Sequence, residues 1–186
     1  MIEADNILRI LRESRTYLKE GNSNELKKLS DQTIHSASLS QDPDNIIVAV
    51  LVYSIGKLIE RPKYREIKGW DKFYNSVIKN LDNAIKHLDK KEIDKCRNHL
   101  GKIRNSINEI SGNLRFYIKD VFRKAEINKA FRMYEHGISS ERTAELLGIS
   151  LWDLSTYIGQ SSVSDSTVAI NIPIRKRIKM TESFFG

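Results

Sequence analysis

Cysteine is nearly missing from this chain of 186 residues, since Cys96 stands alone and has no partner for an intrachain disulfide. The lack of a second cysteine excludes the disulfide-rich scaffolds of small secreted proteins and favours a reducing, cytoplasmic location. Proline is scarce as well, at three residues, which together with a hydrophobic fraction of 40% excludes the disordered and collagen-like classes. The chain is long enough to bury an apolar core without cross-links.

Long apolar runs are also missing. The longest, Ile46 to Tyr53, is followed at once by Ser54, Gly56 and Lys57, whereas a membrane-spanning helix needs about 20 apolar residues. The first residues, Met1 to Asn6, hold no basic segment, so no signal peptide is expected. The sequence therefore predicts no membrane partner and places the apolar run in a buried helix.

Acidic residues are outnumbered by basic ones, because 31 Lys and Arg stand against 24 Asp and Glu and give a net charge of +7. Such an excess favours polyanionic partners through the release of counterions from phosphates. Thirteen of the basic and six of the acidic residues lie between Arg61 and Arg104. A solvated helix face is the simpler interpretation of that local excess.

What the chain does have is apolar residues at spacings of three and four, which predict an all-α fold. We expect helices over Ile2–Leu18, Ser23–Leu39, Ile46–Glu60 and Trp70–Leu88, with Asp44 as a cap of the third. The spacing continues from Glu92 to Val121, which predicts one long helix relaxed at Gly112, and a further helix ends near Gly137. The stretch Val168–Ile172 alternates and precedes Pro173, as in an edge strand or extended arm.

These patterns predict three parts: a helical bundle over residues 1–120, a helix-turn-helix region over 121–160, and a linker with a basic tail over 161–186. The boundary is expected near Lys119 to Lys124, and the stretch from Ser161 to Thr167 is expected to be a flexible linker. No internal repeat stands out, so a repeat array is not needed to explain the helices.

The segment Ile138–Gly159 satisfies the demands of two short helices that cross at a steep angle. Ala144 is small enough for a close approach, and Gly148 supplies the turn four residues later. Apolar residues for the wedge between the helices follow, and Ser150 and Asp153 suit the second N-terminus; the apolar ones are Leu147, Ile149 and Leu154. An ordinary helical hairpin is the alternative, since these residue types are common in helices.

The exposed positions of the second helix decide what it binds. We expect Ser150, Leu151, Trp152, Ser155 and Thr156 to face outward, and none of the residues that mainly read bases, namely Arg, Lys, Asn and Gln, occurs from Ser150 to Gly159. Phosphate contacts are expected from Arg132 and Arg142, with Lys124 and Lys129 as further candidates. Trp152 itself suits a core anchor, a thymine-methyl contact or a protein hot spot.

The residues Ala125–Tyr134, Ile138–Ser139, Ala144–Ser150 and Trp152 give this region a family likeness. It resembles the helix-turn-helix of small antitoxin-like proteins, especially archaeal ones encoded beside PIN-domain ribonuclease toxins. The resemblance covers the C-terminal third of the chain and implies a regulator that binds DNA and holds a PIN-type nuclease. The preceding helices, some 120 residues, are additional to that family.

The tail from Ile170 to Phe185 joins an extended apolar piece to a short basic helix. It can fold back on the core, or it can add a strand or helix to a partner as an inhibitory arm would. The expected partner contacts are Trp152, Ile172, Ile174, Arg175, Lys176, Arg177, Ile178, Phe184 and Phe185.

Catalytic and cofactor patterns are lacking. The four histidines have no zinc spacing, Asp31 and His35 form at most a surface pair, and no phosphate loop or dinucleotide fingerprint is present. The helical N-terminal part has the general shape of HEPN-type RNases, but their Arg-to-His spacing does not occur around Arg97, His99 or Arg104.

Three functions therefore remain in order. The first is a DNA-binding regulator, a homodimer through its N-terminal helices, without enzymatic activity, metal or cofactor. The second is a protein-binding adaptor or antitoxin-like inhibitor that uses Trp152 and the tail. The third is an RNA-cleaving helical domain.

Overall fold

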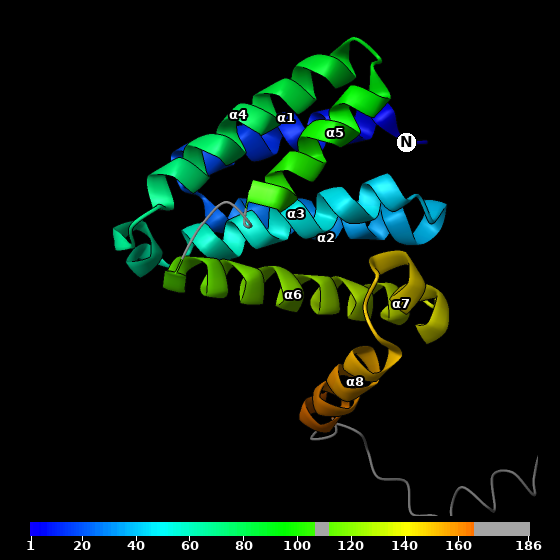
Figure 1. Ribbon diagram of the computed structural model, residues 1–186. Coiled ribbons are helices and arrows are strands. Elements are labelled where there is room, and N and C mark those ends of the chain that lie inside the picture. Colours follow the sequence, from blue (N-terminus) through cyan, green and yellow to red (C-terminus); the bar gives the residue numbers. More distant parts are fainter. Residues whose placement is uncertain (107–111, 166–186) are drawn as a thin grey trace, which may run out of the picture.

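The computed structural model describes residues 1–106 and 112–165, which form α-helices with one short 3₁₀ helix and no strand in those ranges (Figure 1). The predicted all-α class is confirmed. The α-helices are α1 (Ala4–Glu20), α2 (Ser23–Ser40), α3 (Pro43–Ile59), α4 (Trp70–Asp89), α5 (Ile93–Asn105), α6 (Gly112–Glu135), α7 (Ser140–Leu147) and α8 (Leu151–Asp165), and the 3₁₀ helix is η1 (Pro62–Glu66). The tail beyond 165, with the expected strand Val168–Ile172, lies outside the described residues.

The ends of the first helices follow from local chemistry. Gly21 adopts a left-handed conformation (φ 70°) that closes α1, and the Asn22 side chain then accepts a hydrogen bond from the Glu25 amide. Asp42, rather than the expected Asp44, caps α3 by accepting the Asp44 amide at 3.0 Å. The reason is Pro43, which occupies the first turn and makes the residue before it the cap.

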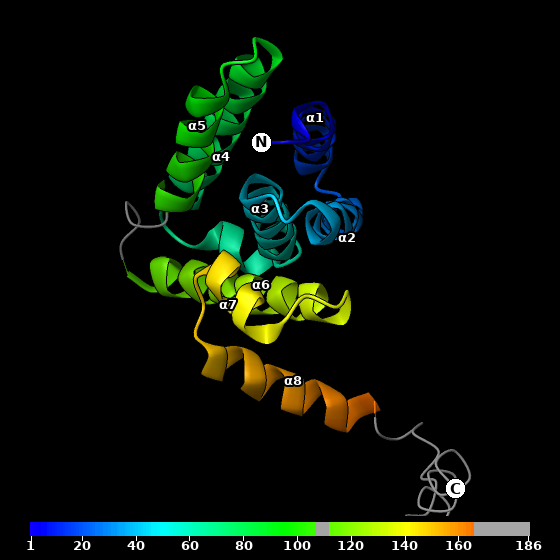
Figure 2. The ribbon, with the colours of Figure 1, turned by 90° about the vertical axis from the view of Figure 1, so that its right-hand side faces the viewer.

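The helices are arranged in tiers (Figure 2). The α4–α5 hairpin forms one tier with α1 beside it, the α2–α3 pair forms the next, and α6 crosses on the far side of α2 and α3. The last two helices follow at the end of α6, and α8 is the outermost (Figure 2). Only this outer tier presents a helix with a face turned fully away from the bundle.

Two apolar cores hold these tiers together, and α6 belongs to both. The first half of α6, including Leu114, Ile118 and Phe122, packs with α1, α3, α4 and α5. The second half, from Ala125 to Met133, packs with α7, α8 and parts of α2 and α3. The predicted boundary after residue 120 therefore falls inside one continuous helix.

The prediction of one long helix from Glu92 to Val121 is wrong. The first part ends at Asn105, where Ser106 follows, and the second begins at Gly112 with a left-handed φ of 70° that no helix interior adopts. The apolar spacing persists because each helix has its own stripe. Leu100 packs in the α4–α5 hairpin, whereas Ile118 belongs to a helix that lies mainly on α3.

Two further comparisons with the sequence concern the C-terminal region. Helix α8 continues to Asp165, so the expected linker from Ser161 is wrong for residues 161–165. Serine is tolerated in helices, and no proline stops the helix after Gly159. Within the described ranges, no helix has both the length and the apolar character that crossing a bilayer requires.

Candidate nucleic-acid interface

The α7 and α8 helices are separate elements joined by a tight turn. The Ser139 side chain accepts the Arg142 amide at 3.2 Å to begin α7, and Gly148 ends it with a left-handed φ of 64°. At the start of α8 the Ser150 hydroxyl oxygen accepts the Asp153 amide at 3.0 Å. The turn at Gly148 and the cap at Ser150 are as the sequence predicts, because both are local features of the chain.

The inner face of this pair rests on α6. Ala144 and Leu147 are buried, and Leu154 is fully buried at 0% exposure. Farther along α8, the Tyr157 ring lies edge-on to Phe131 at 5.4 Å between centroids. The expected wedge positions therefore face the core, which turns the opposite side of α8 to the solvent.

The outer face of α8 consists of the five residues expected there: Ser150, Leu151, Trp152, Ser155 and Thr156, all exposed. Trp152 is 79% exposed and Leu151 is 44% exposed. The core-anchor alternative for Trp152 is therefore wrong, since Leu154 holds that place. An indole with most of its surface in water leaves a contact with another molecule as the remaining explanation.

The two arginines predicted to contact phosphate are exposed, but each is paired on its own helix. Arg132 donates to Glu135 at 2.8 Å, and Arg142 donates to Glu145 at 2.7 Å. Each carboxylate offsets the charge of its arginine locally. These two positions are thus weaker phosphate ligands than their residue type indicates.

Lys129 cannot contact phosphate from its place in this structure, so that expectation is wrong. Its side chain has 0% exposure, its Nζ lies 2.7 Å from Asp31 Oδ1, and it stands 4.1 Å from the centre of the Tyr53 ring. Burial lowers the pKa of Lys129. The sequence contained the sign of this burial, because Ala125, Lys129 and Met133 share one stripe of α6 at a spacing of four.

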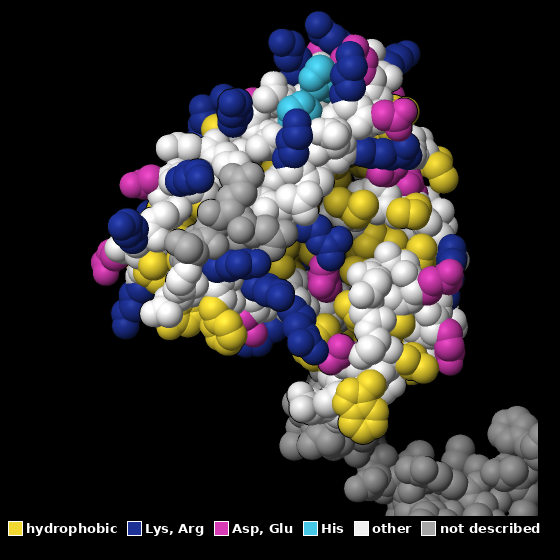
Figure 3. All heavy atoms as spheres, viewed as in Figure 1, with side chains coloured by type: hydrophobic (Ala, Val, Ile, Leu, Met, Phe, Trp, Pro, Cys, Tyr) yellow, Lys and Arg dark blue, Asp and Glu magenta, His cyan; other side chains and the backbone are white. Residues whose placement is uncertain are grey.

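A row of cations along α6 stands in place of these candidates. Arg115, Lys119 and Arg123 are spaced by four, all are exposed, and Lys124 lies beside them. The row of Lys and Arg side chains crosses the middle of the molecular face over α6 (Figure 3). Arg123 Nη2 lies 3.0 Å from Asp153 Oδ1, so the row meets the first turn of α8. The spacing of four could have revealed it from the sequence.

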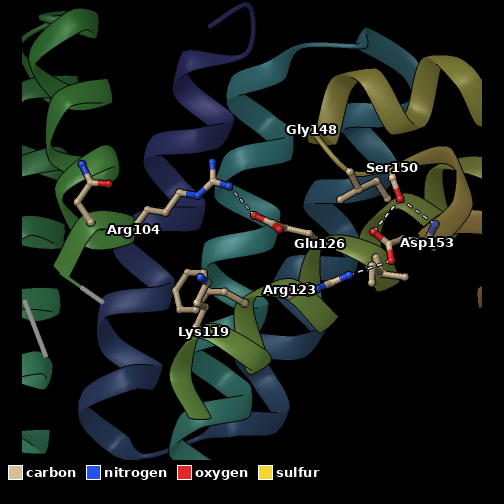
Figure 4. A pocket seen from close by; sticks show the side chains of 11 residues that line it. Arg104, Lys119, Arg123, Glu126, Gly148, Ser150 and Asp153 are labelled. Carbon is tan, nitrogen blue, oxygen red and sulfur yellow. Dashed lines mark hydrogen bonds and ion pairs between the residues drawn. The ribbon is translucent and has the colours of Figure 1, made fainter. Parts of the chain in front are cut away.

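A cavity of about 390 Å³ opens where this row meets the turn (Figure 4). Its charged lining combines the cations Arg104, Lys119 and Arg123 with the carboxylates of Glu126 and Asp153. Arg104 Nη2 lies 2.7 Å from Glu126 Oε1. Burial raises the pKa of Glu126, which Arg104 opposes. Sequence reasoning missed this site because its residues come from α5, α6 and the turn before α8.

The histidines come together in two pairs that sequence spacing does not indicate. The rings of His87 and His99 are stacked with centroids 5.3 Å apart, and His35 meets His136 edge-on at 5.0 Å. Burial lowers the pKa of His99. Asp31 bonds to Lys129 rather than to His35. Across residues 1–106 and 112–165, no three His, Cys, Asp or Glu side chains are grouped to hold a metal ion.

The tail residues predicted to contact a partner fall beyond the described ranges. They are Ile172, Ile174, Arg175, Lys176, Arg177, Ile178, Phe184 and Phe185. Of the predicted partner contacts, Trp152 alone can be placed, at the exposed start of α8. The part of the interface that is described therefore consists of the α8 outer face and the α6 row.

Comparisons with protein-family models, with curated proteins and with solved structures gave no match, so the geometry of this surface is the ground on which a function is proposed.

Proposed function

We propose that this protein is a regulator that binds duplex DNA, with α7 and α8 acting as a helix-turn-helix. The observation that carries the proposal is the exposed outer face of α8, which stands directly beside the cationic row of α6. A helix whose free face adjoins several cations suits a groove bordered by two phosphate chains. The net charge of +7 acts in the same direction.

Affinity in this proposal comes mainly from the phosphates. Arg115, Lys119 and Arg123 supply the contacts, and each neutralised phosphate releases counterions. On the α8 face, Ser155 and Thr156 offer hydroxyl groups to base edges, while Leu151 offers an apolar contact to a thymine methyl. Because no bidentate base reader is present on this face, we expect binding that is salt-sensitive and only modestly selective for sequence.

The test is a fluorescence-anisotropy titration of a labelled duplex at several salt concentrations. The variant R115Q/K119Q/R123Q removes the row, and K72Q/K79Q/K86Q is its matched control, because these three lysines are also exposed and lie along α4. We expect the row variant to bind at least tenfold more weakly. Its slope of log K against log salt should shrink by about 0.9 for each phosphate that the variant no longer neutralises. Equal weakening in the two variants would show that only net charge matters.

A second candidate is a protein-binding adaptor or antitoxin-like inhibitor, and the exposed Trp152 favours it. An indole at 79% exposure next to Leu151 has the composition of a binding hot spot. In this version the partner is a PIN-type nuclease, held by α8 together with the tail after Gln160. W152A and truncation after Gln160 should each abolish capture of a purified nuclease of that class, while DNA affinity changes little.

Homodimerisation belongs to the proposal as well. Helix-turn-helix regulators commonly bind two half-sites as symmetric dimers, and the N-terminal helices are the part available for that contact. We expect a dimer mass in light scattering coupled to size-exclusion chromatography. A monomer mass at all concentrations tested would remove this part of the proposal, together with its expectation of a palindromic site. A cytoplasmic location completes the proposal.

A further inference from the structure

The cavity near the cationic row continues into a second one. The second has a volume of about 270 Å³ and shares Arg104, Phe122, Glu126 and Gly148 with the first. Together they form a recess at the place where α3, α5 and α6 meet the turn between α7 and α8 (Figure 4). Recesses of this size are those in which proteins hold small organic ligands.

One end of the recess is cationic. Arg104, Lys119 and Arg123 outnumber the two carboxylates, Glu126 and Asp153, by one charge. Among the described residues, Arg104 and Arg123 each have a carboxylate partner and Lys119 has none. Figure 4 shows Arg104 and Arg123 reaching toward Glu126 and Asp153, respectively, across the polar end. An anionic group placed here meets a planar guanidinium and an ammonium together.

The other end of the recess is apolar. Aliphatic side chains of α3 form one wall and those of α7 form the opposite wall, with Phe122 at the floor; the aliphatic residues are Ile46, Ile47, Val50, Leu51, Leu146 and Leu147. Ile47 is 42% exposed, so part of this apolar surface is open to solvent. An aliphatic chain lying here would remove that surface from water.

We propose that this recess is a binding site for a small amphiphilic carboxylate of medium chain length. Its head group lies between Arg104 and Lys119, and its hydrocarbon chain lies between α3 and α7. The charge of the cationic end selects an anion, and the apolar walls next to it select a chain attached to that anion. This site does not depend on the proposed DNA contacts of the α8 face.

The site bridges the bundle and the C-terminal helices. Its walls come from α3 and α5 on one side and from α7 and the first turn of α8 on the other. An occupant therefore contacts both and binds only while α7 is seated on α3. Ligand binding should accordingly slow hydrogen exchange in α7, whose apolar face closes the recess.

The test is calorimetric titration of the full chain with octanoate. Acetate and inorganic phosphate are the controls for an anion without a chain, and octanol is the control for a chain without charge. We expect one octanoate per chain, with each control at least tenfold weaker. Absence of octanoate binding, octanol binding as tight as octanoate, or phosphate binding as tight as octanoate would each overturn the proposal.

Variants locate the site. R104Q removes the head-group contact, and I47W fills the apolar end from a position that is already exposed to solvent. Matched controls are R12Q, an exposed arginine paired with Asp89 on the other side of the bundle, and L39W, whose native side chain is 78% exposed. We expect R104Q and I47W each to weaken octanoate at least tenfold while the controls keep it. Unchanged affinity in both site variants would place the ligand elsewhere and overturn the assignment.

Discussion

The two ends of α6 belong to cores of different composition. Toward its N-terminal end, α6 contributes Ile118 and Phe122 to a core that also contains Trp70 and Phe73. Toward its C-terminal end it joins a core in which five of the eleven buried residues are alanines: Ala37, Ala49, Ala125, Ala130 and Ala144. Small side chains let helices approach closely but remove less apolar area from water per residue. We infer that α7 and α8 are held more weakly than the N-terminal bundle.

Buried charge adds to this difference. Lys129 is fully buried in the region of the second core, with Asp31 as its partner, although the Asp31 side chain is 58% exposed. Desolvating an ammonium group costs free energy that an ion pair recovers only in part. The proposed ligand and nucleic-acid contacts lie on this less stable side of the molecule, where helices that move or bind are commonly found.

The largest expected effects come from truncating one aromatic or long side chain in each core. F73A should lower the free energy of unfolding by about 3–5 kcal/mol, and M133A by about 2–5 kcal/mol, because each leaves a cavity. Hydrogen exchange read by mass spectrometry separates the two. F73A should reduce protection throughout the chain, whereas M133A should reduce it first in α7 and α8. Equal loss of protection in α4 after M133A would show that the cores unfold as one unit.

A smaller effect is expected at the buried lysine. K129M keeps the length of the side chain and removes the desolvation cost, while Asp31 stays hydrated because it is exposed. Its stability in urea should equal that of the native chain or exceed it by about 1–4 kcal/mol. K129A is the control, since it leaves a cavity and should destabilise. A strongly destabilised K129M would mean that the ion pair itself holds α6 on α2.

The same lysine makes the comparison sensitive to pH. Because burial lowers the pKa of Lys129 below its ordinary 10.5, the unfolded chain binds more protons than the folded one between the two pKa values. Stability from this residue therefore rises as the pH increases toward 10.5. The difference between the native chain and K129M should move in favour of the native chain over that window, as urea titrations at successive pH values will show.

The smallest expected effect is local to α8. S150A removes the side chain that accepts the Asp153 amide and should cost about 1 kcal/mol. Hydrogen exchange should increase in the first turn of α8 and leave α4 unchanged. S140A is a suitable control, because Ser140 begins α7 while the capping hydroxyl there belongs to Ser139. If S150A loosens α4 as well, the weaker-core interpretation is wrong.

Local features of the structure were predictable and distant ones were not. The breaks at Gly21, Gly137 and Gly148 follow from glycine in left-handed positions, and the outward face of α8 follows from the position of Leu154. The cap of α3 and the interruption between α5 and α6 were mispredicted, because neighbouring residues of similar type offered two solutions. The ion pair of Arg104 with Glu126 joins residues on two helices, so no spacing rule indicates it.

The sequence by itself determined the helical class, most helix ends and which side of α8 faces outward, since these depend on residues within a turn or two of each other. Tertiary structure alone decided that Lys129 is buried, that Arg104, Lys119 and Arg123 line one cavity, and that the histidines meet in pairs. The physical reason is that burial and charge pairing depend on which helix covers which face. Periodicity along one helix records that a face is covered but not what covers it.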